Sequence, residues 1–101
     1  MRPEQILPAE KQALENLLMH AQGATDQSRR VADFLLAWWN PSECGKYDMT
    51  TAWGVDDDIM EEMCVVFRLA SRAHSYPDKL GYEKQFAAII REWRPELGES
   101  E

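Results

Sequence analysis

Residues 31–39 read Val-Ala-Asp-Phe-Leu-Leu-Ala-Trp-Trp, and this stretch decides the fold of the 101-residue chain. Apolar side chains recur in it every three or four residues, the repeat of one helix face: Val31, Phe34, Leu35 and Trp38. Three more apolar side chains widen that stripe around most of the helix: Ala32, Leu36 and Trp39. A helix that is apolar on nearly every side lies at the centre of a domain or contacts a partner. We expect it to end at Asn40, because the residue before a proline avoids the helical conformation.

Segments on either side of this central helix show the same periodicity. We expect a first helix from Pro8 to just before Gly23, since proline suits the first turn and glycine the end of a helix. A third helix is expected over about residues 57–74 and a fourth over about residues 82–93. The third is expected to bury one face: Ile59, Met63, Val66, Phe67 and Ala70. No segment alternates like a strand, so we predict an all-α compact bundle of about four helices with one long irregular connection over about residues 40–55.

The aromatic residues near this connection lead to further predictions. We expect Trp53 to pin the connection to the core, and Asp48 or Thr50 to cap a single helical turn in it. Adjacent helix positions diverge by about 100°, so Trp38 and Trp39 are not expected to face one core. One of them then packs under the connection or is exposed as an anchor for a protein partner, since Trp is enriched at interfaces.

The ends of the chain and its two cysteines lead to predictions about domain extent and compartment. We expect a single helical domain over residues 1–101, with residues 1–7 and 98–101 flexible. The N-terminus lacks the apolar stretch of a signal peptide, and no apolar run approaches the about 18 residues of a membrane span. Two cysteines are too few for a disulfide scaffold, although a Cys44–Cys64 bridge stays open as an alternative. These features predict a cytoplasmic protein.

The negative charge of the chain is concentrated in one segment. The whole chain has 18 acidic and 11 basic residues, which gives a net charge of −7. Residues 40–66 hold seven of the acids and only one base, so this segment carries −6 and the rest is nearly neutral. The acidic excess argues against a nucleic-acid-binding domain, whose surface is basic. The 10% content of aromatic residues argues against intrinsic disorder.

Five of these acids lie close together and invite a cation: Asp56, Asp57, Asp58, Glu61 and Glu62. The EF-hand pattern and the Glu-x-x-His pattern of di-iron bundles are both absent, and capping of a helix start explains the acids. Cys44 is a poor candidate nucleophile because the charge of its neighbour Glu43 raises the pKa of the thiol. We therefore predict that the protein is not an enzyme, and we assign no catalytic, cofactor-binding or metal-binding residue.

Several motifs with aromatic residues follow one another along the chain: Phe34-Leu35-Leu36 with Trp39, Tyr47-Asp48-Met49-Thr50 with Trp53, Tyr76-Pro77-Asp78 with Leu80-Gly81-Tyr82, and Trp93-Arg94-Pro95. Over about residues 31–97, with the first helix outside, this order resembles an uncharacterised family, a domain of unknown function, of small bacterial proteins borne by plasmids and phages. The resemblance implies no activity and no catalytic residue. It implies a bacterial accessory protein of a mobile genetic element.

Together these observations favour a small acidic module that binds a protein partner with a basic surface. The predicted partner-binding residues are the five clustered acids with two aromatic anchors: Asp56, Asp57, Asp58, Glu61, Glu62, Tyr47 and Trp53. An inhibitor of anti-CRISPR or anti-restriction type, which occupies the nucleic-acid-binding surface of its partner, is one form of this hypothesis. We expect no direct contact with nucleic acid or membrane. Two alternatives stay open: a structural or regulatory homo-oligomer such as a homodimer, and a small metal-dependent enzyme that uses the acids of residues 56–62.

Overall fold

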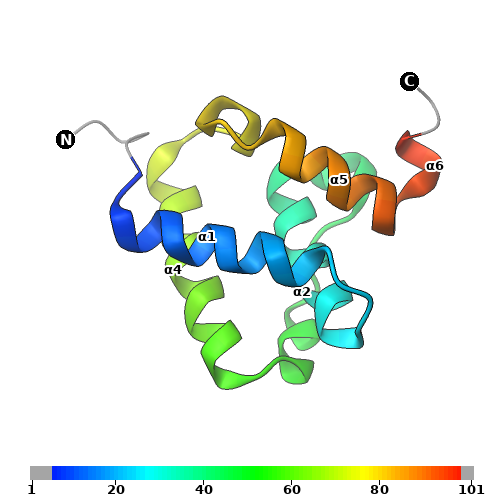
Figure 1. Cartoon of the computed structure of the whole chain (residues 1–101), viewed down its shortest axis with the longest axis horizontal. Coiled ribbons are helices and arrows are strands. Elements are labelled where there is room, and N and C mark those ends of the chain that lie inside the picture. The colour runs from blue at the N-terminus through cyan, green and yellow to red at the C-terminus, as the bar shows by residue number, and fades with distance from the viewer. Residues whose placement is uncertain (1–5, 99–101) are drawn as a thin grey trace.

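The computed structural model describes residues 6–98, which form helices and connections and no strand (Figure 1). The four main helices are α1 (Pro8–Ala21), α2 (Asp26–Trp39), α4 (Asp57–Ala73) and α5 (Glu83–Trp93). Short helical turns lie between and after them: α3 (Pro41–Cys44), the 3-10 helices η1 (Met49–Gly54) and η2 (Pro77–Leu80), and α6 (Pro95–Gly98). No helix in this part of the chain is long and apolar enough to cross a membrane. The predicted all-α bundle of four main helices is confirmed.

Local sequence signals set the ends of these helices. At the start of α1, the Glu10 carboxylate accepts a hydrogen bond of 2.9 Å from the backbone N–H of Leu7, as in a capping box. At the start of α2, the Thr25 hydroxyl accepts a hydrogen bond of 3.0 Å from the backbone N–H of Ser28. α4 ends at His74, whose left-handed backbone (φ 53°) stops the helix. The predicted bounds of the first and third helices are confirmed to within a few residues.

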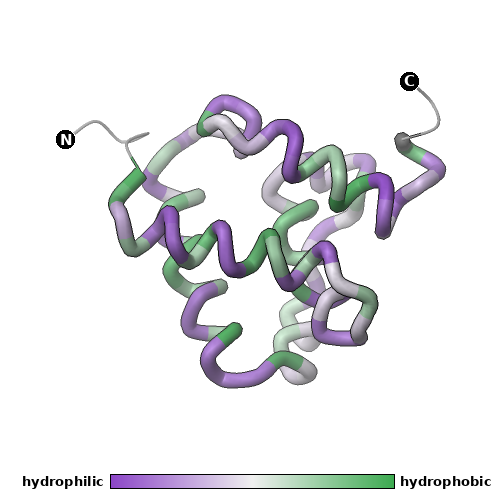
Figure 2. The backbone as a smooth tube through the Cα atoms, viewed as in Figure 1, coloured by the Kyte–Doolittle hydropathy of each residue, from purple (hydrophilic) through white to green (hydrophobic). Residues whose placement is uncertain are grey.

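The core is built around α2. α1 packs against both α2 and α4, and α5 packs against α2 (Figure 1). The largest fully buried side chains come from all four main helices: Leu14, Leu17, Val31, Leu35, Leu36, Val66, Leu69, Phe86 and Ile89. Figure 2 shows hydrophilic and hydrophobic positions alternating along α1, as expected of a helix with one buried face. Most of the apolar circumference of α2 is thus covered within the chain.

Trp38 and Trp39 both contact the core, contrary to the sequence prediction. Each is half-buried, and each packs against Phe86 of α5. The ring of Trp39 stacks on Phe86 at 5.6 Å, while the ring of Trp38 meets it edge-on at 6.2 Å. The indole N–H of Trp38 also donates a hydrogen bond of 3.1 Å to the carbonyl of Ser75. The prediction is wrong because one large side chain of α5 contacts both indole rings although they diverge.

Two arginine residues join helices that are far apart in sequence. Arg72 of α4 donates two hydrogen bonds to the buried Glu10 of α1, one of them 2.7 Å long. The hydrogen bonds from Arg72 hold the pKa of Glu10 below its usual range. At the other end of the molecule, Arg94 donates hydrogen bonds to Asp33 of α2 at 2.9 Å and to the carbonyl of Cys44 at 3.0 Å. These contacts fix α1 on α4 and the end of α5 on α2 and α3.

The long connection between α2 and α4 is more regular than predicted, because it contains α3 and η1. The predicted cap is confirmed: the Asp48 carboxylate accepts hydrogen bonds from the backbone N–H of Thr50 at 2.9 Å and from its hydroxyl at 2.8 Å. Arg30 of α2 donates a hydrogen bond of 2.8 Å to the carbonyl of Thr51. Its guanidinium lies directly over Gly54, where an added Cβ would come within 2.2 Å of Arg30 Nε. η1 is therefore held to α2 by a side chain.

The predicted flexible ends fall mostly on residues 1–5 and 99–101, which lie outside the described residues. Of the remainder, Ile6 packs against the core and Leu7 is the N-cap of α1. At the other end, Gly98 closes the short helix α6.

Candidate functional site

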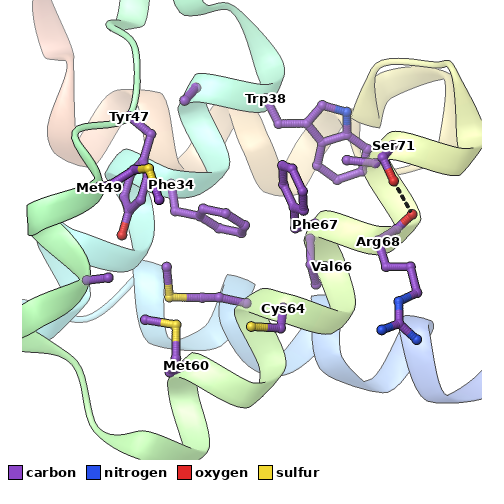
Figure 3. A pocket seen from close by; sticks show the side chains of 14 residues that line it. Phe34, Trp38, Tyr47, Met49, Met60, Cys64, Val66, Phe67, Arg68 and Ser71 are labelled. Carbon is purple, nitrogen blue, oxygen red and sulfur yellow. Dashed lines mark hydrogen bonds between the residues drawn. The ribbon is translucent and has the colours of Figure 1, made fainter.

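One large apolar groove opens between α2, η1 and α4 (Figure 3). Its volume of about 840 Å³ lies in the upper part of the range of about 300–1,000 Å³ that is typical of ligand pockets. α2 and the connection line it with Phe34, Ala37, Trp38, Tyr47, Met49 and Ala52. α4 lines it with Met60, Met63, Cys64, Val66, Phe67, Arg68, Ala70 and Ser71. The walls are therefore almost wholly apolar, with four aromatic rings and three methionines among them.

Phe67 lies in this apolar groove and not in the core, contrary to the sequence prediction. Its side chain is 65% exposed, whereas Leu69 and Ala73 on the same helix are buried. The prediction is wrong because α4 packs mainly against α1 and makes few contacts with α2. The buried face of α4 is therefore turned toward α1, and the face toward α2 and η1 is left open (Figure 3).

The short helix η1 presents large apolar side chains beside the apolar groove. Trp53 is 85% exposed and Met49 is 81% exposed. The expectation that Trp53 pins the connection to the core is therefore wrong. Arg30 and the Asp48 cap hold η1 in place, which leaves the indole of Trp53 free to point outward. Exposed aromatic and methionine side chains next to an apolar groove are typical of interaction surfaces.

Tyr47 carries the unusual polar group of the apolar groove. Its ring packs edge-to-face on Phe34 with the ring centroids 5.4 Å apart. Its hydroxyl oxygen is buried and has no hydrogen-bond partner within residues 6–98. Burial, with the nearby carboxylate of Asp33, raises the pKa of the Tyr47 phenol, which therefore stays protonated at neutral pH. A buried hydroxyl without a partner is destabilising.

The structure separates the clustered acids into those beside the apolar groove and those directed elsewhere. Asp57 and Glu61 are exposed on α4. Asp57 lies one turn before Met60 and Glu61 one turn before Cys64, and residues three apart are neighbours on a helix surface. Neither carboxylate lines the apolar groove itself; both lie near the start of α4, within one turn of residues that line it, and we call them the acidic rim. Arg68 is exposed farther along the same helix.

The other acids of the cluster have different neighbours. Asp56 exchanges hydrogen bonds with Gln27 of α2, at 2.8 Å through its backbone N–H and at 3.3 Å through its carboxylate. Glu62 accepts a hydrogen bond from the side-chain amide of Asn16 in α1. Asp58 is exposed in the first turn of α4. Of the seven predicted partner-binding residues, only Tyr47 therefore lines the apolar groove; Trp53 is exposed directly after the lining residue Ala52, and none of the five acids is among the lining residues.

The residues that carry chemistry do not gather into a reactive centre. Cys44 and Cys64 are free thiols; Cys44 is buried, and Cys64 is exposed in the apolar groove. Burial, with the nearby charge of Glu43, raises the pKa of the Cys44 thiol. In the part of the chain that the structure describes, no three His, Cys, Asp or Glu side chains are placed to hold a metal ion together.

Most residues of the apolar groove were not predicted from the sequence to be part of a binding surface: Phe34, Met49, Met60, Cys64 and Phe67. One signal was present in the sequence. Met60, Cys64 and Phe67 follow one another at intervals of four and three residues, which forms a second apolar row beside the row of Ile59, Met63 and Val66. An apolar arc that is wider than the surface one neighbouring helix can cover indicates that part of the arc contacts another element or stays exposed.

Comparison with known proteins places the chain in a family. Residues 11–94 match the family of unknown function DUF7673, and the chain belongs to it. The resemblance to an uncharacterised family is thereby confirmed, and the match begins within α1, so the first helix is not outside it as expected. No curated protein and no solved structure matches the chain.

Proposed function

We propose that this protein is a non-catalytic interaction module that binds a basic segment of a partner protein in the apolar groove and beside its acidic rim. The observation that supports this most is the exposure of large apolar side chains around one groove, chiefly Met49, Trp53 and Phe67. Scattered apolar residues are normal on a protein surface, whereas a contiguous apolar groove marks a site of interaction. Trp and other aromatic residues are also the ones that supply most binding energy at interfaces.

The charge of the chain favours a basic partner over a second copy of itself. The chain carries −7 in total, and −6 lies within residues 40–66, which include η1 and the start of α4. The predicted set of Asp56, Asp57, Asp58, Glu61 and Glu62 supplies most of that charge and steers a basic partner toward this end of the molecule. Two copies that met at this surface would bring like charges together, which is unfavourable.

A finer version of the proposal concerns a partner whose basic surface binds nucleic acid. The protein would then be an inhibitor, of anti-CRISPR or anti-restriction type, that competes with DNA or RNA for that surface. This version rests on the charge of the chain and on the mobile-element origin that the family resemblance suggests. It predicts that the partner binds either this protein or nucleic acid, never both together.

Selection of random peptides displayed on phage, against the immobilised protein, tests the proposed function. The matched pair of variants is Phe67→Ser in the apolar groove and Met19→Ser on α1, because Met19 is also exposed (72%) but lies outside the groove. The wild-type protein and Met19→Ser are expected to enrich the same peptides, rich in Lys and Arg. Phe67→Ser is expected to bind them about thirtyfold more weakly, the equivalent of a loss of about 2 kcal/mol at an interface anchor.

Two results would contradict the proposal. One is that no peptide is enriched on the wild-type protein. The other is that the enriched peptides bind Phe67→Ser as tightly as Met19→Ser, which would place the binding surface elsewhere. Circular dichroism of both variants shows that their helices are intact before binding is compared.

A further inference from the structure

We infer that the segment bound in the apolar groove is an amphipathic helix of about three turns, whose basic residues lie beside the acidic rim. This inference rests on the proposed function and deepens it, because it states the conformation and the charge pattern of the partner segment. It follows from three properties of the apolar groove: the form of its walls, the scarcity of polar groups in it, and the distribution of charge along it.

The walls of the apolar groove have the form of a seat for a third helix. On α4, Met60, Cys64, Phe67 and Ser71 form a row at intervals of four, three and four residues. On α2, Phe34 and Trp38 form a similar row opposite to them (Figure 3). Rows of this spacing are the ridges along which helices pack against one another. With a rise of about 1.5 Å per residue, the row on α4 is about 16 Å long, which matches a helix of about three turns.

The scarcity of polar groups in the apolar groove selects a helix over an extended segment. An extended segment would bring backbone N–H and C=O groups into a surface that cannot bond to them, which is unfavourable. Of the polar groups in the lining, the hydroxyl of Tyr47 is buried and that of Ser71 already donates to the carbonyl of Arg68, which leaves the exposed guanidinium of Arg68. Residues 6–98 also contain no strand to which an extended segment could be added. A helix satisfies its own backbone groups and presents only side chains.

The charge along α4 gives the bound helix a polarity. Asp57 and Glu61 are exposed near the start of α4, within one turn of the lining residues Met60 and Cys64, and the exposed Arg68 lines the apolar groove farther along the same helix. Lys and Arg residues of the partner therefore contribute most favourably to the binding free energy beside Asp57 and Glu61. Beside Arg68 their contribution is unfavourable. Methionine side chains at the same end, Met49 and Met60, adapt to differently shaped apolar residues. The charge pattern therefore gives more selectivity than the shape of any one apolar side chain.

Alkylation of Cys64 tests the inference, because this exposed thiol lies in the apolar groove and Cys44 provides a buried control. The probes are three synthetic peptides of equal length that are based on Leu, Ala and Lys. The first has helical periodicity with its Lys residues grouped at one end, the second has the same residues in an order without that periodicity, and the third has two prolines in the middle of the first. Iodoacetamide labelling of each cysteine is followed by mass spectrometry.

We expect the first peptide alone to protect Cys64. At about ten times its Kd it leaves about a tenth of the protein free, so alkylation of Cys64 slows about tenfold while that of Cys44 is unchanged. The double variant Asp57→Asn, Glu61→Gln is expected to raise the Kd about tenfold at low salt and much less at high salt. Arg68→Gln, the matched control on the same exposed side of α4, is expected to leave the Kd unchanged or to lower it.

The other outcomes separate the inference from the proposed function. Equal protection of Cys64 by the second peptide, which lacks helical periodicity, or by the third, which contains proline, would overturn the inference that the bound segment is a helix. The proposed function would still stand. Protection that is insensitive to Asp57→Asn, Glu61→Gln would overturn the assigned charge pattern. If no basic peptide protects Cys64, both the inference and the proposed function fail. Protection without any peptide, together with a doubled mass in solution, would show that a second copy occupies the apolar groove instead, and would also overturn the inference.

Discussion

The side of α4 that meets α1 and the side that faces α2 and η1 both carry large apolar side chains, and they differ in what covers them. Leu69 on the first side is fully buried, and Phe67, only two residues earlier on the second side, is 65% exposed. The first side is also closed by an ion pair between Arg72 and the buried Glu10. The carboxylates of Asp57 and Glu61, in contrast, are exposed to solvent.

This difference shows how one helix serves two purposes. The side toward α1 supplies stability, since burial of an apolar side chain stabilises the folded state by about 1.5–3 kcal/mol. The side toward η1 contributes little stability and keeps its apolar surface available for a partner. Substitutions on the two sides should therefore separate stability from binding, and the predictions below test that separation.

The largest effect on the free energy of unfolding is expected for Leu69→Ala. Removing a fully buried leucine leaves a cavity and should lower the free energy of unfolding by about 3 kcal/mol, within the range for such substitutions. Phe67→Ala, two residues away, should change it by less than about 0.5 kcal/mol, because the side chain is exposed. Urea denaturation followed by circular dichroism measures both. Equal losses for the two variants would mean that the two sides of α4 do not differ as described.

A smaller effect is expected for Arg72→Met. It removes the hydrogen-bond partner of a buried carboxylate and should lower the free energy of unfolding, by less than Leu69→Ala does. The double variant Glu10→Gln, Arg72→Met should recover part of that loss, because no uncompensated charge then remains. The double-mutant cycle from denaturation curves gives the coupling energy. A coupling energy near zero would show that the ion pair does not hold α1 on α4.

The same ion pair predicts a dependence of stability on pH. Because the pKa of Glu10 is lowered in the folded protein, its stabilising effect is fully present above the unfolded value of about 4.3 and is lost as the pH falls through the folded value. The stability advantage of the wild-type protein over Glu10→Gln should therefore be constant near neutral pH and should shrink below about pH 4.3. Denaturation curves between neutral and acidic pH test this. An advantage that grows on acidification has the wrong sign for the proposed pair.

The smallest effect on stability is expected for Trp53→Ala on the open side. With 85% of its side chain exposed, the residue should contribute less than about 0.5 kcal/mol to the free energy of unfolding. Its fluorescence should nevertheless be the most accessible to acrylamide, since the other three tryptophans are half-buried. Comparison of acrylamide quenching in the wild-type protein and the variant checks this. A quenching curve unchanged by Trp53→Ala would place the indole in the core after all.

The features of the fold that depend on neighbouring residues could be predicted from the sequence. Proline and glycine mark the bounds of α1, and Asp48 caps η1 through bonds to Thr50, two residues away. The acidic concentration in residues 40–66 could also be counted directly. These predictions succeeded because short-range hydrogen bonds and backbone preferences decide such features.

The candidate site depended on contacts that no local pattern specifies. Whether Leu69 or Phe67 is buried depends on which helix covers α4, and that choice involves Glu10 and Arg72, which are 62 residues apart. The exposure of Trp53 likewise depends on Arg30, a residue of another helix. Tyr47 was predicted as a partner-binding residue, but the apolar groove that it lines joins three segments distant in sequence. Helical periodicity indicates how much apolar surface a helix has, and not which neighbour covers it.

The contact between Arg30 and Gly54 has a consequence for how this family varies. A β-carbon at position 54 would displace the guanidinium, the flexible end of the Arg30 side chain, whereas the backbone of Gly54 has no unusual conformation. The two positions should therefore co-vary among members of the family: a chain with alanine or a larger residue at position 54 should carry a shorter side chain at position 30. In such a chain the carbonyl of Thr51 loses its present donor, so η1 should be anchored differently there. An alignment of family members can reveal this paired change before any protein is made.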